Sequence, residues 1–89
     1  MLDETLRALG DPTRREILRV LRLGDLTAGE IAARFPMTAA SVSHHLSVLK
    51  EAGLVSVQRD GRNLIYSIET TVFQDFMEQM VGLLDKEER

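Results

Sequence analysis

The side chains best suited to hydrogen-bonding chemistry gather in one short stretch, Ser41 to Ser47. The seven positions hold three serines and two adjacent histidines, His44 and His45. Serine hydroxyls donate and accept hydrogen bonds, and an imidazole can donate to a guanine or phosphate oxygen. Because serine and alanine are short, a helix that carries them could approach a base edge closely. The composition of this stretch therefore indicates a surface that enters a groove of DNA.

A helix must position these residues. Thr38 is a typical N-cap residue and Gly53 a typical left-handed terminator, so we predict a helix that lasts until Ala52. Four apolar residues share one side of it at about 100° per residue and are expected to face the core: Ala39, Val42, Leu46 and Leu49. The remaining side and the cap carry the predicted DNA contacts: Thr38, Ala40, Ser41, Ser43, His44 and Ser47.

A solvated helix face is the alternative interpretation, because any surface helix carries polar residues. The neighbouring elements favour DNA. Thr27 and Glu30 form a Thr-x-x-Glu capping box, which predicts a short helix running to about Phe35. A short helix, a tight connection at Pro36 and Met37, and a second helix follow helix-turn-helix spacing.

The two histidines could instead bind a metal ion. Neighbouring residues on a helix point about 100° apart, so His44 and His45 chelate one ion poorly. The chain has no cysteine, and no third histidine or suitably spaced acid accompanies the pair. We therefore predict no metal site, and we expect His45 to be partly buried and hydrogen-bonded within the fold.

A hairpin is predicted after the helix. Residues 54–59 and 63–68 alternate in polarity as strands do, and Asp60-Gly61 between them is a hairpin turn signal. This places Arg59 and Arg62 at the tip, where they could reach backbone phosphates or a narrow minor groove. A charged tip also protects a sheet edge from pairing, which is the alternative.

Two helices are predicted before the capping box. A leucine pattern in residues 1–10 gives the first, which ends near Gly10. Asp11 then offers an N-cap oxygen, Pro12 suits the first helical position, and Gly24 closes the second helix. The arginines of this second helix are expected mostly on its outside.

The last predicted helix starts at about Thr71 and is too apolar for one core-facing stripe. Eight of the thirteen residues 72–84 are apolar. Such a surface suits contact with a second copy of the chain, so segments 1–10 and 70–86 are predicted as dimerisation helices. Met77 and Met80 could alternatively line a small-molecule pocket. The predicted interface comprises Leu2, Leu6, Leu9, Val72, Phe73, Phe76, Met77, Met80 and Leu84.

Composition limits the function classes. A chain of 89 residues makes one domain with a modest core, and the lack of cysteine excludes disulfides and thiolate metal sites. No apolar run is long enough for a membrane span or a signal peptide, so we expect a cytoplasmic protein. The net charge of −3 arises in residues 69–89, which hold two basic and six acidic side chains. No catalytic group or phosphate-binding glycine loop is recognisable, so we predict neither an enzyme nor a cofactor.

Three segments together resemble the ArsR/SmtB winged-helix repressors. These are Asp-Pro-Thr-Arg-Arg-Glu-Ile-Leu from Asp11, Thr-Ala-Gly-Glu-Ile-Ala from Thr27, and Ser-Val-Ser-His-His-Leu-Ser-Val-Leu from Ser41. The likeness covers nearly the whole chain, and residues 24–29 with Thr70 and Thr71 are most similar to SdpR-type autorepressors. It implies a mainly α fold with a small β-hairpin, a winged helix-turn-helix domain spanning 1–89, with the fourth helix as the recognition helix.

Many relatives of this kind sense metals through a Cys-x-Cys pair or through histidines and acids of the last helix. Here residues 23–26 lack cysteine, and the last helix offers only Asp75 and Glu78 without histidine. The inducer of those relatives therefore does not carry over. The SdpR-like resemblance implies instead a regulatory protein partner, which could be membrane-bound.

The resulting expectation is a homodimeric transcriptional repressor of double-stranded DNA, autoregulatory by its likeness to SdpR-type proteins. Two recognition helices would enter successive major grooves of an inverted-repeat operator. No small-molecule substrate is expected. The alternative is a winged-helix protein-interaction module that never binds DNA directly, which the acidic balance would permit.

Overall fold

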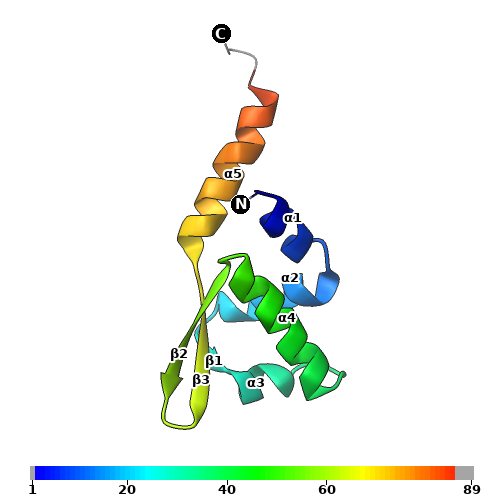
Figure 1. Cartoon of the computed structure of the whole chain (residues 1–89), viewed down its shortest axis with the longest axis vertical. Helices are drawn as coiled ribbons and strands as arrows, with labels where there is room; N and C mark the ends of the chain where they lie inside the picture. Colours follow the sequence, from blue (N-terminus) through cyan, green and yellow to red (C-terminus); the bar gives the residue numbers. More distant parts are fainter. Residues whose placement is uncertain (1, 86–89) are drawn as a thin grey trace.

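The elements of the fold follow the start and stop signals of the chain closely. The computed structural model describes residues 2–85 (Figure 1). In chain order the elements are α1 (Leu2–Leu9), α2 (Pro12–Leu21), β1 (Leu26–Thr27), α3 (Ala28–Ala32), α4 (Ala39–Glu51), β2 (Val55–Asp60), β3 (Asn63–Ile68) and α5 (Thr70–Leu84). The predicted winged helix-turn-helix order is confirmed.

Side chains cap the helices where the sequence predicts. Oδ2 of Asp11 accepts a hydrogen bond from the backbone N–H of Arg14 (3.1 Å), with Pro12 as the first residue of α2. Both bonds of the Thr27–Glu30 capping box are present, at 3.1 and 2.8 Å. At the end of α4, Gly53 has φ +77°, a left-handed conformation that glycine adopts without a Cβ clash. These local signals fix the helix boundaries.

The sheet differs from the predicted hairpin in having a third strand. Its order is β1-β3-β2, and all pairs are antiparallel. Leu26 lies opposite Tyr66, so the residues just before α3 tie the helix-turn-helix to the wing. A strand of two residues shows no periodicity, and the sequence therefore gave no sign of it.

The turn and the third helix also differ from expectation. Asp60 pairs with Asn63 as the last residue of β2, so the loop is Gly61-Arg62 rather than Asp60-Gly61. Gly61 takes the required positive φ of +65°. α3 ends at Ala32, and single turns carry the chain on to Phe35.

The core lies where α1, α2, α3 and α4 meet the sheet. Its buried residues are Ala8, Ile17, Leu18, Leu21, Ile31, Val42, Leu46, Leu49, Ala52, Leu54 and Val55. Three of the four predicted core residues of α4 belong to it. Ala39, the first residue of α4, is exposed instead. The remaining apolar stripe holds α4 firmly while its other side faces solvent.

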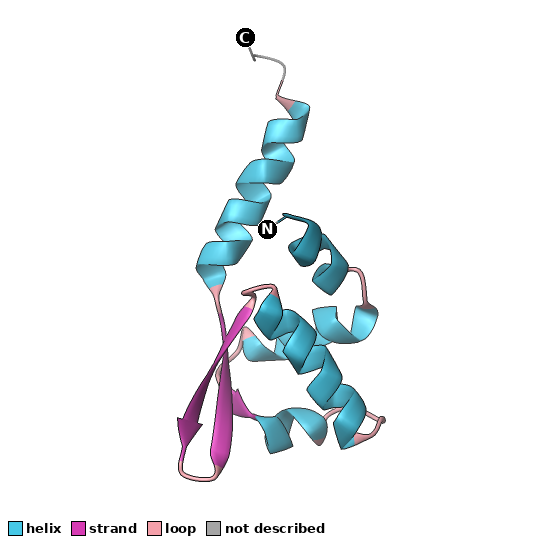
Figure 2. Ribbon diagram, viewed as in Figure 1, coloured by secondary structure: helices cyan, strands magenta, loops and turns pink. Residues whose placement is uncertain are grey.

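α5 leads away from the sheet and past α1 (Figure 2). The described chain is elongated, with principal extents of 52 × 24 × 20 Å. The wing and the N-terminal end of α4 lie at one end of the long axis, and the C-terminal end of α5 lies at the other (Figure 1). Among the described residues, no helix has both the length and the apolar character needed to cross a membrane.

Candidate nucleic-acid interface

The outward side of α4 presents small polar groups that are free to bind. The five predicted contacts on the helix are all exposed: Ala40, Ser41, Ser43, His44 and Ser47. Within residues 2–85, no side-chain hydrogen bond engages the three serines or His44. Their donors and acceptors can therefore bond to base edges and phosphates without first breaking bonds within the protein.

Thr38 prepares the N-terminal end of this helix. Its hydroxyl oxygen accepts from the backbone N–H of Ser41 at 3.1 Å, and the residue itself is exposed. The hydroxyl hydrogen is still available to a phosphate oxygen. The other free N–H groups of the first turn add partial positive charge, which favours an anion at this position.

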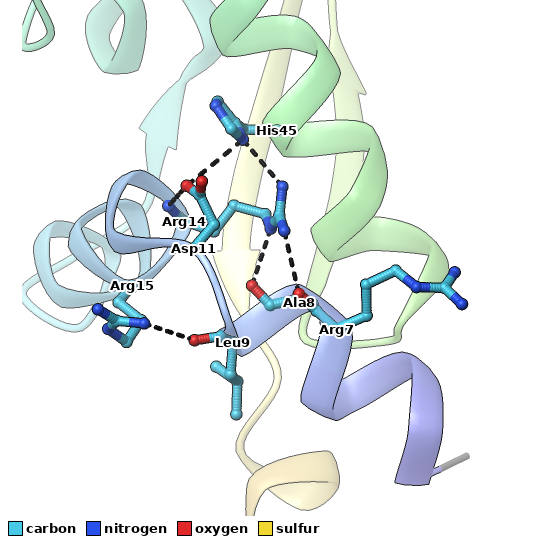
Figure 3. Close-up of polar contacts among 7 residues, drawn as sticks. All are labelled: Arg7, Ala8, Leu9, Asp11, Arg14, Arg15 and His45. Carbon is cyan, nitrogen blue, oxygen red and sulfur yellow. Dashed lines mark hydrogen bonds and ion pairs between the residues drawn. The ribbon is translucent and has the colours of Figure 1, made fainter.

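His45 turns away from this surface, as expected. Its side chain is only 17% exposed, and its Nδ1 accepts a hydrogen bond from Nη1 of Arg14 at 3.1 Å (Figure 3). An arginine can only donate, so this contact requires an unprotonated Nδ1. Oδ2 of Asp11 lies 3.8 Å from the same nitrogen. His45 thus belongs to the internal structure of the domain.

Arg14 is a residue that sequence reasoning misplaced on the outside of α2. It is half-buried, and its guanidinium also donates to backbone carbonyl oxygens of α1. Helical spacing could have indicated this position. Arg14 precedes Ile17 and Leu18 by three and four positions and therefore lies on the same, core-facing side of α2.

The same contacts affect the ionisation of Asp11. Burial alone would raise the pKa of this carboxyl. The hydrogen bond from the backbone N–H of Arg14 and the proximity of His45 and Arg14 outweigh that effect and hold the pKa below its ordinary value of 3.8. The carboxylate is therefore the form that the fold favours.

The wing arginines are both exposed, but only one occupies the turn. Arg62 lies in the loop, whereas Arg59 lies within β2 opposite Leu64. Asp60 stands between them in the chain and is exposed as well. Two guanidinium groups thus project from the end of the molecule that also holds the start of α4.

The predicted dimer residues divide into two groups. Leu6, Met77 and Leu84 are 46%, 62% and 82% exposed. The others are half-buried: Leu2, Leu9, Val72, Phe73, Phe76 and Met80. Leu9, Val72 and Phe73 in fact pack against the core of their own chain. Val81 and Leu83, outside the predicted set, are exposed at 65% and 72% and extend the apolar surface. No residue of α5 is fully buried.

Two grooves flank the base of α5. The larger, of about 470 Å³, is lined by apolar residues that include Leu18 and Phe73, by two arginines of α2 and by Arg22 just after it. The smaller, of about 210 Å³, separates α1 from α5. Within residues 2–85, no three His, Cys, Asp or Glu side chains come together as a metal site would require.

These features define a class of protein, the winged helix-turn-helix DNA-binding proteins. Residues 11–57 match the family model described as bacterial regulatory protein, arsR family. The transcriptional repressor SdpR of Bacillus subtilis is 44% identical over 85 residues, which cover 96% of this chain and 94% of that protein. The regulator NmtR of Mycobacterium tuberculosis is 38% identical over 86% of this chain and 64% of its own length.

Solved structures agree. A crystal structure of an ArsR family transcriptional regulator superposes with a TM-score of 0.90 at 30% identity, covering 99% of this chain and 98% of that one. The solution structure of a homodimeric winged helix-turn-helix DNA-binding domain from Mycobacterium bovis, a possible ArsR-family regulator, gives 0.73 at 30% identity, with coverages of 98% and 84%.

The chain belongs to the arsR family of bacterial regulatory proteins. Its relatives are named as repressors and regulators, and it is a DNA-binding transcriptional regulator rather than an enzyme.

Proposed function

We propose that this protein is a transcriptional repressor that binds an inverted-repeat operator as a homodimer and represses its own gene. The observation that carries the proposal is the outward side of α4, where the serines and His44 are exposed and make no side-chain hydrogen bond within residues 2–85, at the same end of the molecule as the wing. Occupancy of a promoter by such a dimer excludes RNA polymerase.

The proposed contacts divide by role. The α4 residues enter the major groove, where His44 and the serines meet base edges and the short side chain of Ala40 allows close approach. Thr38 and the wing arginines bind backbone phosphates, which positions the helix. The full proposed set is Thr38, Ala40, Ser41, Ser43, His44, Ser47, Arg59 and Arg62.

Dimerisation is proposed through α1 and α5, in the segments 1–10 and 70–86, of which residues 1 and 86 lie outside the described range. Support comes from the apolar side of α5, which runs from Val72 to Leu84 without a buried residue. A large exposed apolar surface of this kind marks an interaction site. The polar side of α5 is acidic, so it repels the phosphates of DNA and disfavours nonspecific binding through this helix.

Release from DNA is proposed to depend on a regulatory protein. The proposal takes a protein rather than a metal ion as the signal because residues 23–26 lack cysteine and the last helix carries acids without histidine. This part of the proposal follows from the SdpR-type resemblance of residues 24–29 with Thr70 and Thr71, and a membrane protein is one candidate for the partner. The repressor itself acts in the bacterial cytoplasm, where the chromosome lies.

A binding titration tests the proposal. Operator sequences are first selected from a random DNA pool with the purified full chain, and the upstream DNA of its own gene is tested by mobility shift. With about three phosphate contacts per subunit, roughly six in all, the logarithm of affinity should fall with the logarithm of salt concentration at a slope of about −5. A slope near zero, or no selected sequence, would contradict DNA binding and favour a protein-interaction module.

The variant His44→Ala separates base contact from phosphate contact. Loss of one good base contact should weaken operator binding by about 1 to 3 kcal/mol and leave binding to random DNA unchanged. Equal weakening on both DNAs would remove His44 from the base-reading set.

A further inference from the structure

Arg14 connects α1 to α4 through one guanidinium group. Nε donates to the carbonyl oxygen of Ala8 at 2.8 Å, and Nη2 donates to that of Arg7 at 3.0 Å. Nη1 donates to Nδ1 of His45 at 3.1 Å, so each nitrogen of the group is engaged (Figure 3). Arg14 and His45 themselves lie 31 positions apart in the chain.

The link is rigid for chemical reasons. The last carbonyls of a helix lack partners within it; in α1 the Ala8 carbonyl receives its partner from Arg14, and the Arg7 carbonyl accepts from Arg14 as well as from the backbone N–H of Gly10. The guanidinium is planar, and its N–H groups point in fixed directions, so two bonds to α1 also fix the direction of the third. Val42, Leu46 and Leu49 pack α4 into the core, but apolar packing is not directional; the carboxylate of Asp11 also lies 3.8 Å from Nδ1 of His45, on the same side of the helix as Arg14.

The position of His45 relates this link to DNA reading. His45 precedes the exposed Ser47 by two residues and follows the exposed His44 directly, yet its own side chain points inward. A change in the tilt of α4 against α1 would therefore move the reading residues without altering them. In a symmetric dimer the same change in tilt occurs in both subunits. The two changes therefore add in their effect on the separation of the two α4 helices.

We propose that Arg14 and His45 are positioning residues that set the separation of the two α4 helices in the dimer, and thereby the half-site spacing that the repressor accepts. The inference rests on the proposed function, because α1 must be held in the dimer interface for the link to act. Neither side chain contacts DNA in this role. Their effect passes through α4 as a whole.

The test uses a series of operators that differ only at the centre. The selected operator is compared with versions in which one base pair is inserted or deleted at the dyad, and with one in which a half-site is scrambled. The wild-type chain should prefer the selected spacing strongly. In His45→Ala this preference should fall about fivefold to tenfold, the lower range of coupling between sites, while affinity for the half-scrambled operator stays unchanged.

Two further variants identify the cause. In His45→Asn the amide oxygen can accept from Arg14 where Nδ1 did, so the wild-type preference should return. Arg15→Ala is the matched control, because Arg15 also donates to an α1 carbonyl, that of Leu9 at 2.8 Å, but is exposed and has no bond to α4. It should keep the wild-type preference. Circular dichroism and sedimentation confirm folding and dimerisation of each variant.

Arg14→Lys is a second variant that breaks the link, for use if His45→Ala does not fold. Lysine keeps the positive charge but lacks the planar guanidinium group. This variant should lose the spacing preference in the same way. The proposal is overturned if the folded, dimeric variants keep the wild-type spacing preference. It is also overturned if they lose as much affinity for the half-scrambled operator as for the full operator. Wild-type chain that binds no operator, or that stays monomeric, overturns the proposed function itself and this inference with it.

Discussion

Met77→Glu should separate the proposed dimer without disturbing the single chain. Met77 lies near the middle of the apolar side of α5 and is 62% exposed, so its side chain contributes little to the packing of its own subunit. The variant therefore changes the surface between two chains and leaves the core that holds α4 in place.

The magnitude follows from that exposure. Full burial of a methionine side chain is worth about 2 kcal/mol, so covering the exposed 62% is worth about 1.2 kcal/mol for each copy. A symmetric interface holds two copies, which gives about 2.5 kcal/mol, or roughly a sixtyfold rise in the dimer dissociation constant. The cost of desolvating two carboxylates adds to this value, so sixtyfold is the minimum.

Sedimentation equilibrium over a range of chain concentrations measures this constant, and far-UV circular dichroism checks the fold. Thr71→Glu is the matched control, since it adds the same charge at an exposed position of the same helix about 120° away from Met77 and outside both grooves. The control should dimerise like the wild type. A Met77→Glu chain with unchanged dimerisation, or an equal loss in both variants, would refute the assignment of this side of α5 to the interface.

Three other perturbations follow from the structure. Arg59→Ala and Arg62→Ala should each weaken operator and random DNA alike and, because each removes one phosphate contact from both subunits, reduce the salt slope by about two in a binding titration, whereas Arg22→Ala just after α2 should change neither. Asp11→Asn keeps the N-cap and removes its charge. Because folding lowers the pKa of Asp11, its contribution is present above the ordinary pKa of 3.8 and is lost as pH falls through the lowered value, so the difference in Tm between wild type and variant should be present at pH about 6 and shrink as pH falls below 3.8. Gly53→Ala should lower the free energy of unfolding by about 1 to 2 kcal/mol in urea titration, because φ is +77° there and a residue with a Cβ is strained in that conformation; an unchanged midpoint would contradict the left-handed assignment.

The helix boundaries were predictable because the chemistry that sets them is local. Thr27 and Thr38 accept hydrogen bonds from backbone N–H groups three positions later, and Gly53 ends its helix by adopting a left-handed conformation. These effects are local, so the helix ends can be predicted without knowledge of the tertiary structure. The solvent-facing side of α4 could also be predicted from the sequence, because the spacing of its apolar residues determines which side faces the core.

Contacts between distant segments were not predictable in this way. The pairing of Leu26 with Tyr66 leaves no periodic trace in two residues, and the bond from Arg14 to His45 joins two helices that only the complete core brings together. Ala39 shows the opposite case: its spacing is that of a core residue, but as the first residue of α4 it is exposed.

The lack of any fully buried residue in α5 has a consequence for the lifetime of the chain. Val72 and Phe73 hold only the first turn of α5 against the core, and a helix of this length is marginal in water where it lacks packing, so the C-terminal part of α5 would unravel often in a lone chain. Proteases cut frayed ends first, and unpaired copies would be removed sooner than paired ones. Under such selective turnover, the concentration of dimer would rise more than in proportion to the rate of synthesis. This would sharpen the threshold of synthesis above which the promoter is repressed.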